Sequence, residues 1–311
     1  MTQDRFEAIS ARGGAADLSA RAKWTLTGGD RVRYLNGQVT NQVKRATVEE
    51  SVYACVTNVK GRIEGDIFVH AAGSAESSRL VVDAEAGLRE SLGMRLERYI
   101  IADDVELLDV TEEWQLWHFF GEAVSLTSAL DLSSTAQSVK SRRFGLPGVD
   151  IWWPASEPFP TVATELIVSP EELEAWRILQ GVPAWPTELN GEVFPPEAGL
   201  QDQGMDYAKG CYIGQEILSR IKTTGKMPQT LVRLEAQEAQ APLEAGAALY
   251  SAREDDTLQQ IGHVTSVTLS PSTHRPTGLA YVKQAFAAKR SLLLAPDADP
   301  KITFLVDIIP S

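Results

Sequence analysis

The chain has 311 residues, which exceeds the usual size of one hydrophobic core and predicts two or three packed units. Its formal net charge of −13 disfavours direct, extensive binding of RNA or DNA, because phosphate recognition depends on a surplus of lysine and arginine. The hydrophobic fraction of 43% and the charged fraction of 23% are ordinary for a globular protein and exclude a disordered one.

No segment approaches the roughly 18 consecutive apolar residues of a membrane span, and the charged first residues lack the apolar core of a secretory signal. Two cysteines, Cys55 and Cys211, are too few for the disulfide framework of a secreted domain. We therefore expect a cytoplasmic protein in a reducing compartment, with no membrane partner.

The first third of the chain has the pattern of an α+β unit. Residues 24–26 predict a strand, and Asp30 can cap a short helix over residues 31–36 that Gly37 ends. Further on, residues 86–99 carry apolar side chains at helical spacing and predict an amphipathic helix packed on a sheet.

Between these helices, residues 51–57 and 62–70 flank a turn signal and predict a β-hairpin. Period two sorts the second strand into two faces. One face carries Ile63, Gly65, Ile67 and Val69, and the other carries Arg62, Glu64, Asp66, Phe68 and His70.

The middle of the chain contains less regular segments. Residues 125–141 are rich in serine and threonine, and the tryptophans and prolines of residues 152–160 predict an irregular connection. Ser169, Pro170 and Glu172 then form a capping-box pattern that opens a helix ending at Gly181.

The C-terminal part changes to short β-type runs separated by glycine, proline and serine turns. The runs cover residues 231–234, 248–250, 261–269, 279–282, 291–294 and 302–308. They predict a small all-β barrel or sandwich. We accordingly divide the chain into residues 1–226 and residues 227–311.

The most informative stretch is the octapeptide Lys209, Gly210, Cys211, Tyr212, Ile213, Gly214, Gln215, Glu216. Glycines let a ligand approach the backbone, and a neighbouring cation or helix start favours a thiolate. A lone cysteine is otherwise more often a small buried hydrophobic residue. The thiolate of Cys211 can attack an electrophile, form a mixed disulfide or ligate a thiophilic metal, and the residues alone do not choose among these.

This octapeptide matches the KGCYxGQE signature of the YgfZ-type folate-binding proteins, which are relatives of the glycine-cleavage T-protein. Residues 195–200 lead into this loop and form one block of the same superfamily with it. Three further segments resemble other blocks of that superfamily: residues 29–41, residues 60–66 and residues 261–266. The resemblance implies an α+β, T-protein-like three-lobed ring, with two α+β N-terminal subdomains and a small C-terminal β-barrel.

The resemblance also implies a ligand, tetrahydrofolate or a one-carbon derivative, held near the centre of the ring. Glu197 matches the position associated with the pterin ring, whose adjacent donors a carboxylate can accept as a pair. Asp66 is a second candidate contact. Five further residues are candidates for folate binding. Arg62 and Arg220 are cations that suit the carboxylates of the folate tail, and Lys209, Tyr212 and Gln215 belong to the loop.

The function implied is a folate-dependent role in assembling or repairing iron–sulfur clusters of client enzymes, some of which modify tRNA, with Cys211 as the reactive residue. The alternative is a folate-dependent aminomethyltransferase, but Gly65 stands where those enzymes have a second aspartate next to the one at Asp66. A cysteine hydrolase and a non-catalytic scaffold stay open as well. No metal-ligand spacing is present, so we expect no stable metal site held by the protein alone.

Overall fold

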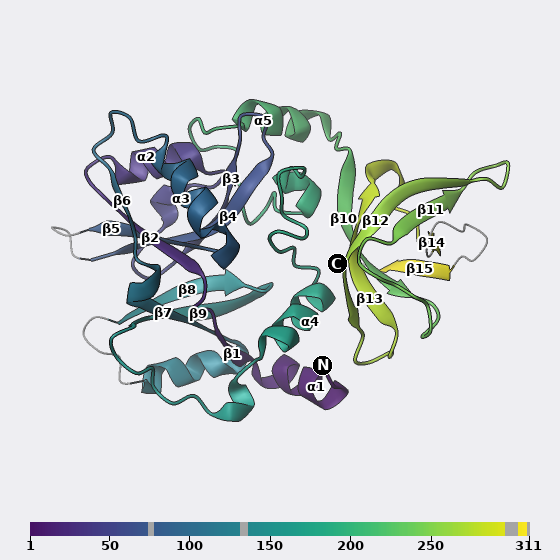
Figure 1. The fold of residues 1–311 in the computed structure, drawn as a ribbon, viewed down its shortest axis with the longest axis horizontal. Helices are drawn as coiled ribbons and strands as arrows, with labels where there is room; N and C mark the ends of the chain where they lie inside the picture. The colour runs from purple at the N-terminus through teal and green to yellow at the C-terminus, as the bar shows by residue number, and fades with distance from the viewer. Residues whose placement is uncertain (74–77, 131–135, 296–303, 310–311) are drawn as a thin grey trace.

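The computed structural model describes residues 1–73, 78–130, 136–295 and 304–309. Three lobes surround a common centre: a sheet with covering helices, a second sheet, and a β-barrel (Figure 1). The two α+β lobes and the C-terminal barrel predicted for the chain are therefore confirmed.

The first lobe is an antiparallel sheet in the order β3–β4–β5–β2–β6. Its strands are β2 (Ala22–Thr27), β3 (Val52–Thr57), β4 (Ile63–Ala72), β5 (Arg79–Ala84) and β6 (Glu106–Asp109). Helices α2 (Arg31–Gln38) and α3 (Arg89–Glu97) cover one face, where Leu35 and Leu92 join Trp24 in a buried core.

The alternation predicted along β4 is confirmed from Gly65 onward, and it decides which side chains reach the centre of the molecule. It is wrong for the first two residues, because the pairing with β3 shifts register between Gly65 and Ile63: Ile63 packs with Cys55 and Tyr281, and Glu64 lies 2.6 Å from Arg95 of α3. A Cβ atom at Gly65 would lie 3.0 Å from Leu88, on the face covered by α3. Asp66 and Phe68 point the other way and line a cavity. Because neighbouring strand residues face opposite sides, a carboxylate at position 65 would lie among leucines and not beside Asp66.

The second lobe is a four-stranded sheet in the order β1–β7–β9–β8, with helix α1 (Gln3–Arg12) beside it. Its strands are β1 (Gly14–Asp17), β7 (Trp114–Phe120), β8 (Gln137–Arg143) and β9 (Leu146–Pro154). The irregular connection expected over residues 152–160 begins only after Pro154, because Trp152 and Trp153 lie in β9. Both are buried, so the strand is covered on both faces and lacks the alternating signal. Residues 131–135 of the weakly patterned stretch lie outside the described residues.

The third lobe is a closed barrel in the order β10–β13–β12–β11–β14–β15. Its strands are β10 (Gln229–Ala236), β11 (Ala248–Ala252), β12 (Leu258–Leu269), β13 (Pro276–Lys283), β14 (Ser291–Ala295) and β15 (Phe304–Ile309). Each predicted β-run corresponds to one strand, although residues 302–303 lie outside the described part. The domain boundary at residue 226 stays a prediction.

Helix α4 follows its predicted signals. Helix α4 (Pro170–Gln180) has Ser169 as N-cap in a capping box and ends at Gly181, whose φ of 75° is left-handed. Helix α5 (Gln215–Thr224) follows the cysteine loop. None of the helices within the described ranges is long and apolar enough to cross a membrane.

Two details of the earlier helices differ from expectation. Helix α2 continues through Gly37, and the side chain of Asp30 makes no capping bond but accepts from the backbone N–H of Asp104 at 3.0 Å. The helix predicted over residues 86–99 begins with the 3₁₀ turn η2 (Ala86–Leu88) before α3. Local sequence sets helix position well, but neighbouring chain segments decide how each end is bonded.

A buried ion pair connects α4 to the barrel. Arg177 on α4 lies 3.0 Å from Glu188, whose side chain is fully buried. Ser266 of β12 donates to Glu188 at 2.5 Å and accepts from Arg177 at 3.0 Å. These bonds satisfy charges that would otherwise be costly to bury, and they place the barrel against the rest of the chain.

We expect Glu188→Gln to lower the free energy of unfolding by on the order of 3 kcal/mol, because it leaves Arg177 as a poorly compensated buried cation. Glu174 is the matched control: it also contacts Arg177, but its side chain is 52% exposed. Glu174→Gln should cost less than about 1 kcal/mol. Urea unfolding of both variants tests this, and equal losses would contradict it.

Candidate functional site

A cavity lies between the two sheets and the segment that follows α4. Its walls include Arg21, Tyr53, Asp66, Phe68, Arg143 and Trp185. The volume is about 80 Å³. Sites for small organic ligands usually have roughly 300 to 1,000 Å³, so a bicyclic ligand requires the walls to move or a connection to a larger groove.

Asp66 is the buried carboxylate of this cavity. One oxygen, Oδ2, accepts from the hydroxyl of Tyr53 at 3.2 Å, while Oδ1 has no hydrogen-bond partner among the described residues. Burial raises the pKa of Asp66 to about 6, an effect that the positive charge of Arg21 partly offsets. A carboxyl group that titrates near neutral pH can both accept and donate a proton there.

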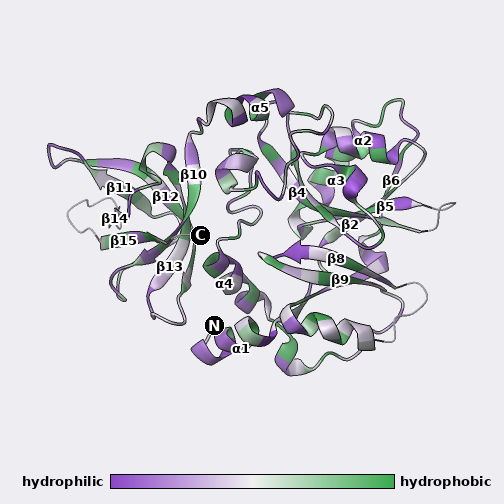
Figure 2. Ribbon diagram, turned by 180° about the vertical axis from the view of Figure 1, so that it is seen from behind, coloured by the Kyte–Doolittle hydropathy of each residue, from purple (hydrophilic) through white to green (hydrophobic). Residues whose placement is uncertain are grey.

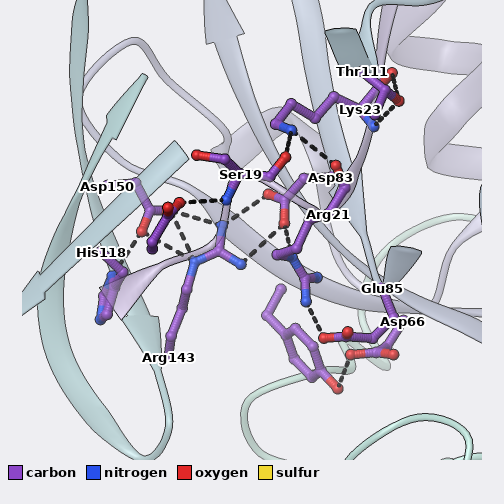
Figure 3. Close-up of polar contacts among 12 residues, drawn as sticks. Ser19, Arg21, Lys23, Asp66, Asp83, Glu85, Thr111, His118, Arg143 and Asp150 are labelled. Atoms are coloured by element: carbon purple, nitrogen blue, oxygen red, sulfur yellow. Dashed lines mark hydrogen bonds and ion pairs between the residues drawn. The ribbon is translucent and has the colours of Figure 1, made fainter. Parts of the chain in front are cut away.

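Buried ion pairs join the two sheets next to this carboxylate (Figure 3). Arg143 of β8 lies 2.8 Å from Asp150 in its own sheet and 2.8 Å from Asp83 in the other. Arg21 lies 2.5 Å from Asp83, and Nδ1 of His118 lies 2.7 Å from Asp150. Burial lowers the pKa of His118 more than Asp150 raises it. The network holds the cavity walls together.

The octapeptide that contains Cys211 wraps around the end of α2. The ammonium of Lys209 donates to the backbone carbonyls of Asn36 and Val39, both at 2.5 Å, and the N–H of Ile213 donates to the carbonyl of Gly37 at 3.1 Å. A cation at a helix C-terminus satisfies carbonyls that have no partner within the helix. Burial lowers the pKa of Lys209 to about 8, although Asp206 opposes the shift.

The same loop is attached to the turn of the β3–β4 hairpin. The hydroxyl of Thr57 donates to the carbonyl of Ile213 at 2.6 Å. Gly214 has a φ of 86°, and a Cβ atom there would lie 2.6 Å from the carbonyl oxygen of Asn58. Glycine is required at this position by both its conformation and the close approach. Segments that resembled separate family blocks in the sequence therefore form one junction.

Within this junction, Cys211 is exposed and Tyr212 is buried. The ring of Tyr212 lies 4.9 Å from the ammonium of Lys209. Two hydrogen bonds of the Lys209 ammonium go to backbone carbonyls at the end of α2, and the folate contact expected of Lys209 stays a prediction. The loop is held from within while its thiol faces the surface.

Glu197 lies in the 3₁₀ turn η6 (Pro195–Ala198) and is fully buried. Its carboxylate accepts from the N–H of Phe194 at 2.8 Å and lies 3.4 Å from Arg62, whose guanidinium stacks on the ring of Phe194 at 3.5 Å. Burial raises the pKa of Glu197, and these bonds and those of Gln229 oppose it.

The structure brings the candidate residues to different places. The described lining of the cavity includes Asp66 and none of the other seven. Those seven are Arg62, Glu197, Lys209, Cys211, Tyr212, Gln215 and Arg220. Their roles stay predictions. Sequence reasoning missed Arg21, Tyr53 and Arg143 as cavity residues, since no local pattern marks a contact between two sheets.

We expect Asp66→Asn to stabilise the protein at neutral pH but not in acid. The carboxyl titrates near 6 in the folded state and near 3.8 in the unfolded chain, so raising the pH removes the proton from the unfolded state first and favours unfolding. The gain should be on the order of 2 kcal/mol above pH 7 and vanish below about pH 3.5.

Asp109→Asn is the control for this pH series. At Asp109 the effect of burial is outweighed by the bonds of Arg89 and Thr111, so its pKa is lowered and its substitution should reduce stability at neutral pH. Thermal unfolding from pH 3.5 to pH 8 measures both. A pH-independent effect of Asp66→Asn would contradict the assignment.

We expect Lys209→Met to loosen the cysteine loop without unfolding the protein. Loss of two charge-assisted bonds to α2 should increase hydrogen exchange of the Ile213 amide at least about tenfold. Lys222→Met, on α5 with its ammonium over Tyr207, is the matched control and should leave that amide unchanged. Hydrogen exchange measured by mass spectrometry tests this prediction. Equal protection of the Ile213 amide in both variants would show that Lys209 does not hold the loop.

Comparison with known protein families agrees with this architecture. Residues 1–137 match the model of the GCVT N-terminal domain, and residues 229–298 match that of the glycine cleavage T-protein C-terminal barrel domain. The second match falls on the barrel, and the first covers the first sheet and part of the second.

Similar curated proteins carry two kinds of name. The iron-sulfur cluster assembly factor IBA57 homolog, mitochondrial, of Pyricularia oryzae is 27% identical over 222 residues, which cover 68% of this chain and 54% of that protein. The homolog of Dictyostelium discoideum is 25% identical, over 67% of this chain and 59% of that protein. The chain thus spans little more than half the length of these relatives. The aminomethyltransferase of Anoxybacillus flavithermus is 24% identical over 92% of this chain and 83% of that protein.

A solved structure shows the same fold. The glycine cleavage system aminomethyltransferase T from Bartonella henselae superposes with a TM-score of 0.79 over 97% of this chain and 87% of that one, at 19% identity. The two domain matches, which fall on the first lobes and on the barrel, support a T-protein-like superfamily for this chain.

Proposed function

We propose that the chain is a YgfZ-type, tetrahydrofolate-binding factor for the assembly or repair of iron–sulfur clusters in client enzymes, including enzymes that modify tRNA. The observation that carries the proposal is an exposed thiol, Cys211, on a loop bonded to both α2 and the β3–β4 turn. The names of the IBA57 relatives support the iron–sulfur part.

The cavity supports the folate part. It contains two buried polar atoms without a described hydrogen-bond partner, Oδ1 of Asp66 and Nη2 of Arg21. A ligand that offers both a donor and an acceptor would satisfy them, and the heterocycle of a folate has both. Bound folate would supply a one-carbon or reducing centre, and Asp66 would hold a proton near it.

In this proposal the iron–sulfur cluster is cargo on its way to the client enzyme and not a permanent cofactor of this chain, and Cys211 contacts it in passing. A cluster normally takes four ligands, and within the described residues no three histidine, cysteine or carboxylate side chains are placed to hold a metal. Cys211 therefore offers one ligand or one sulfur contact, and the client supplies the others. Because the client is a protein, the acidic chain does not have to bind RNA.

The aminomethyltransferase alternative draws support from relatives with that name and from Asp66. Our sequence argument against it relied on Gly65, yet position 65 faces α3 and not the cavity. What favours the iron–sulfur role over this alternative is Cys211, an exposed thiol that amine transfer to folate does not require.

The IBA57 relatives carry mitochondrial in their names, whereas the cytoplasmic location expected for this chain stays a prediction.

We expect Cys211→Ala to bind tetrahydrofolate within about twofold of wild type, because the thiol lies outside the described cavity lining. The same variant should fail to restore iron–sulfur enzyme activity in cells that lack the protein. Asp66→Asn should lose at least about tenfold in folate affinity, since a charge-assisted bond is replaced by a neutral one. Calorimetric titration and an enzyme assay in complemented cells measure these effects.

Cys55→Ala is the matched control, because Cys55 is the buried cysteine of β3 and should not be needed for client activity. Full activity of the client enzymes with Cys211→Ala would contradict the proposed role of the thiol. If the wild type does not bind tetrahydrofolate, the proposed folate binding is wrong.

A further inference from the structure

Helix α5 has one buried face and one exposed face. Leu218 and Ile221 are buried, whereas Glu216, Arg220 and Thr224 recur at successive turns and are exposed. Figure 2 shows the helix at the outer edge of the molecule, between the first lobe and β10, and Figure 1 agrees. The exposed face of α5 is therefore accessible to another molecule.

The β3–β4 turn and the cysteine loop extend this exposed face. A Cβ atom at Gly61 would lie 3.4 Å from the Cβ of Ile217, so the turn packs against the beginning of α5. In the same turn Val59 is 72% exposed, and Lys60 is exposed as well. The loop that contains the exposed Cys211 leads directly into α5. The α5 surface is defined here by six exposed residues of these segments: Val59, Lys60, Cys211, Glu216, Arg220 and Lys226.

The α5 surface carries a surplus of positive charge, although the whole chain has a net charge of −13. It contains the cations Lys60, Arg220 and Lys226 and a single carboxylate, Glu216. None of these three cations makes a side-chain hydrogen bond or ion pair with the described residues. Because their charge is not neutralised within the described chain, the surface around Cys211 attracts anions.

The chemistry of this surface suits an acidic protein better than a nucleic acid. Val59 offers an apolar side chain, and interfaces between proteins combine apolar contacts with complementary charges. Nucleic acids are bound through many phosphates, which three cations on an acidic chain match poorly and which Glu216 repels. Carboxylates on a protein can instead be placed opposite Lys60, Arg220 and Lys226 and away from Glu216.

We propose that the α5 surface docks the client protein through an acidic patch of that client, and that docking brings the cluster site of the client to Cys211. This inference rests on the proposed iron–sulfur function. The described lining of the central cavity contains neither Lys60 nor Arg220 nor Lys226, so docking uses different side chains from the cavity. Complementary charge mainly raises the rate of association, which suits a partner that binds, receives its cargo and leaves.

The first test uses two peptides of equal length as probes on the full chain. Each carries one cysteine as a 2-pyridyl disulfide, flanked by glutamates in one peptide and by lysines in the other. The thiolate of Cys211 attacks the peptide sulfur and forms a new disulfide, while the pyridyl sulfur leaves with the bonding electrons, takes up a proton and is measured by absorbance. We expect the glutamate peptide to react roughly tenfold faster in low salt, and the ratio to fall as salt is added.

The variant Lys60→Gln, Arg220→Gln, Lys226→Gln should bring this ratio close to one. The matched control removes three other exposed arginines that have no side-chain partner among the described residues: Arg12→Gln, Arg275→Gln, Arg290→Gln. It should keep the wild-type ratio. Iodoacetamide, a neutral reagent, should alkylate Cys211 at the same rate in all three proteins, which shows that the thiol itself is unchanged.

The second test measures iron–sulfur enzyme activity in cells that lack the protein and receive each variant. We expect the variant without Lys60, Arg220 and Lys226 to restore at least about fivefold less activity than the arginine control, because docking is slower. Circular dichroism of each variant confirms that the fold is kept.

Equal reaction of the wild type with both peptides, or a wild-type ratio in the variant without the three cations, would overturn the inference. So would full client activity with that variant, and if Cys211→Ala still abolished activity, the proposed function would stand without this docking surface. Full activity with Cys211→Ala as well would instead refute the proposed function. Binding of tRNA to the wild type that the three substitutions abolish would assign the surface to RNA and also overturn the inference.

Discussion

The arrangement of the first two lobes depends on the pairing of Asp83 with two arginines. Asp83 is buried on β5, and it contacts Arg21 before β2 and Arg143 on β8. A buried charge without a partner would cost several kcal/mol, so the two sheets must meet in the register that brings these groups together. Asp150, which lies in the same sheet as Arg143, forms a second ion pair with that arginine. The cavity lies where this register leaves Asp66 and Arg21 incompletely bonded.

The second constraint is the junction around the cysteine loop. Thr40 donates to the carbonyl of Gly204 at 2.5 Å, and Asn41 donates to the carbonyl of Gln203 at 2.9 Å. Together with Lys209, these side chains satisfy backbone groups of segments that lie far apart in the sequence. Much of the sequence signature therefore encodes the support of the loop. Cys211 is exposed, as are Gly210 and Glu216, and it is the member of the signature that carries a thiol.

The cavity and Cys211 are distinct parts of one protein. The described cavity lining contains Asp66 but not Cys211, and the two residues lie on different elements, β4 and the loop before α5. Both elements meet at the turn of the β3–β4 hairpin, where Thr57 bonds the loop. The hairpin thus contacts the cysteine loop at Ile213, two residues after Cys211.

Local patterns determined much of the fold. Capping residues placed α4, alternation sorted the faces of β4 from Gly65 onward, and short β-runs predicted each strand of the barrel, because these signals arise between residues close in sequence. Alternation failed for Ile63 and Glu64, because a register shift between β3 and β4 is set by the pairing of the strands. The second sheet was not recognised, since β9 is buried on both faces and carries no alternation. Of the site, Asp66 and Cys211 were identified from motifs. Only the tertiary structure decided that Arg21 and Arg143 meet Asp83, that Lys209 turns inward and that Gly65 faces a helix, because each depends on packing between segments distant in the chain.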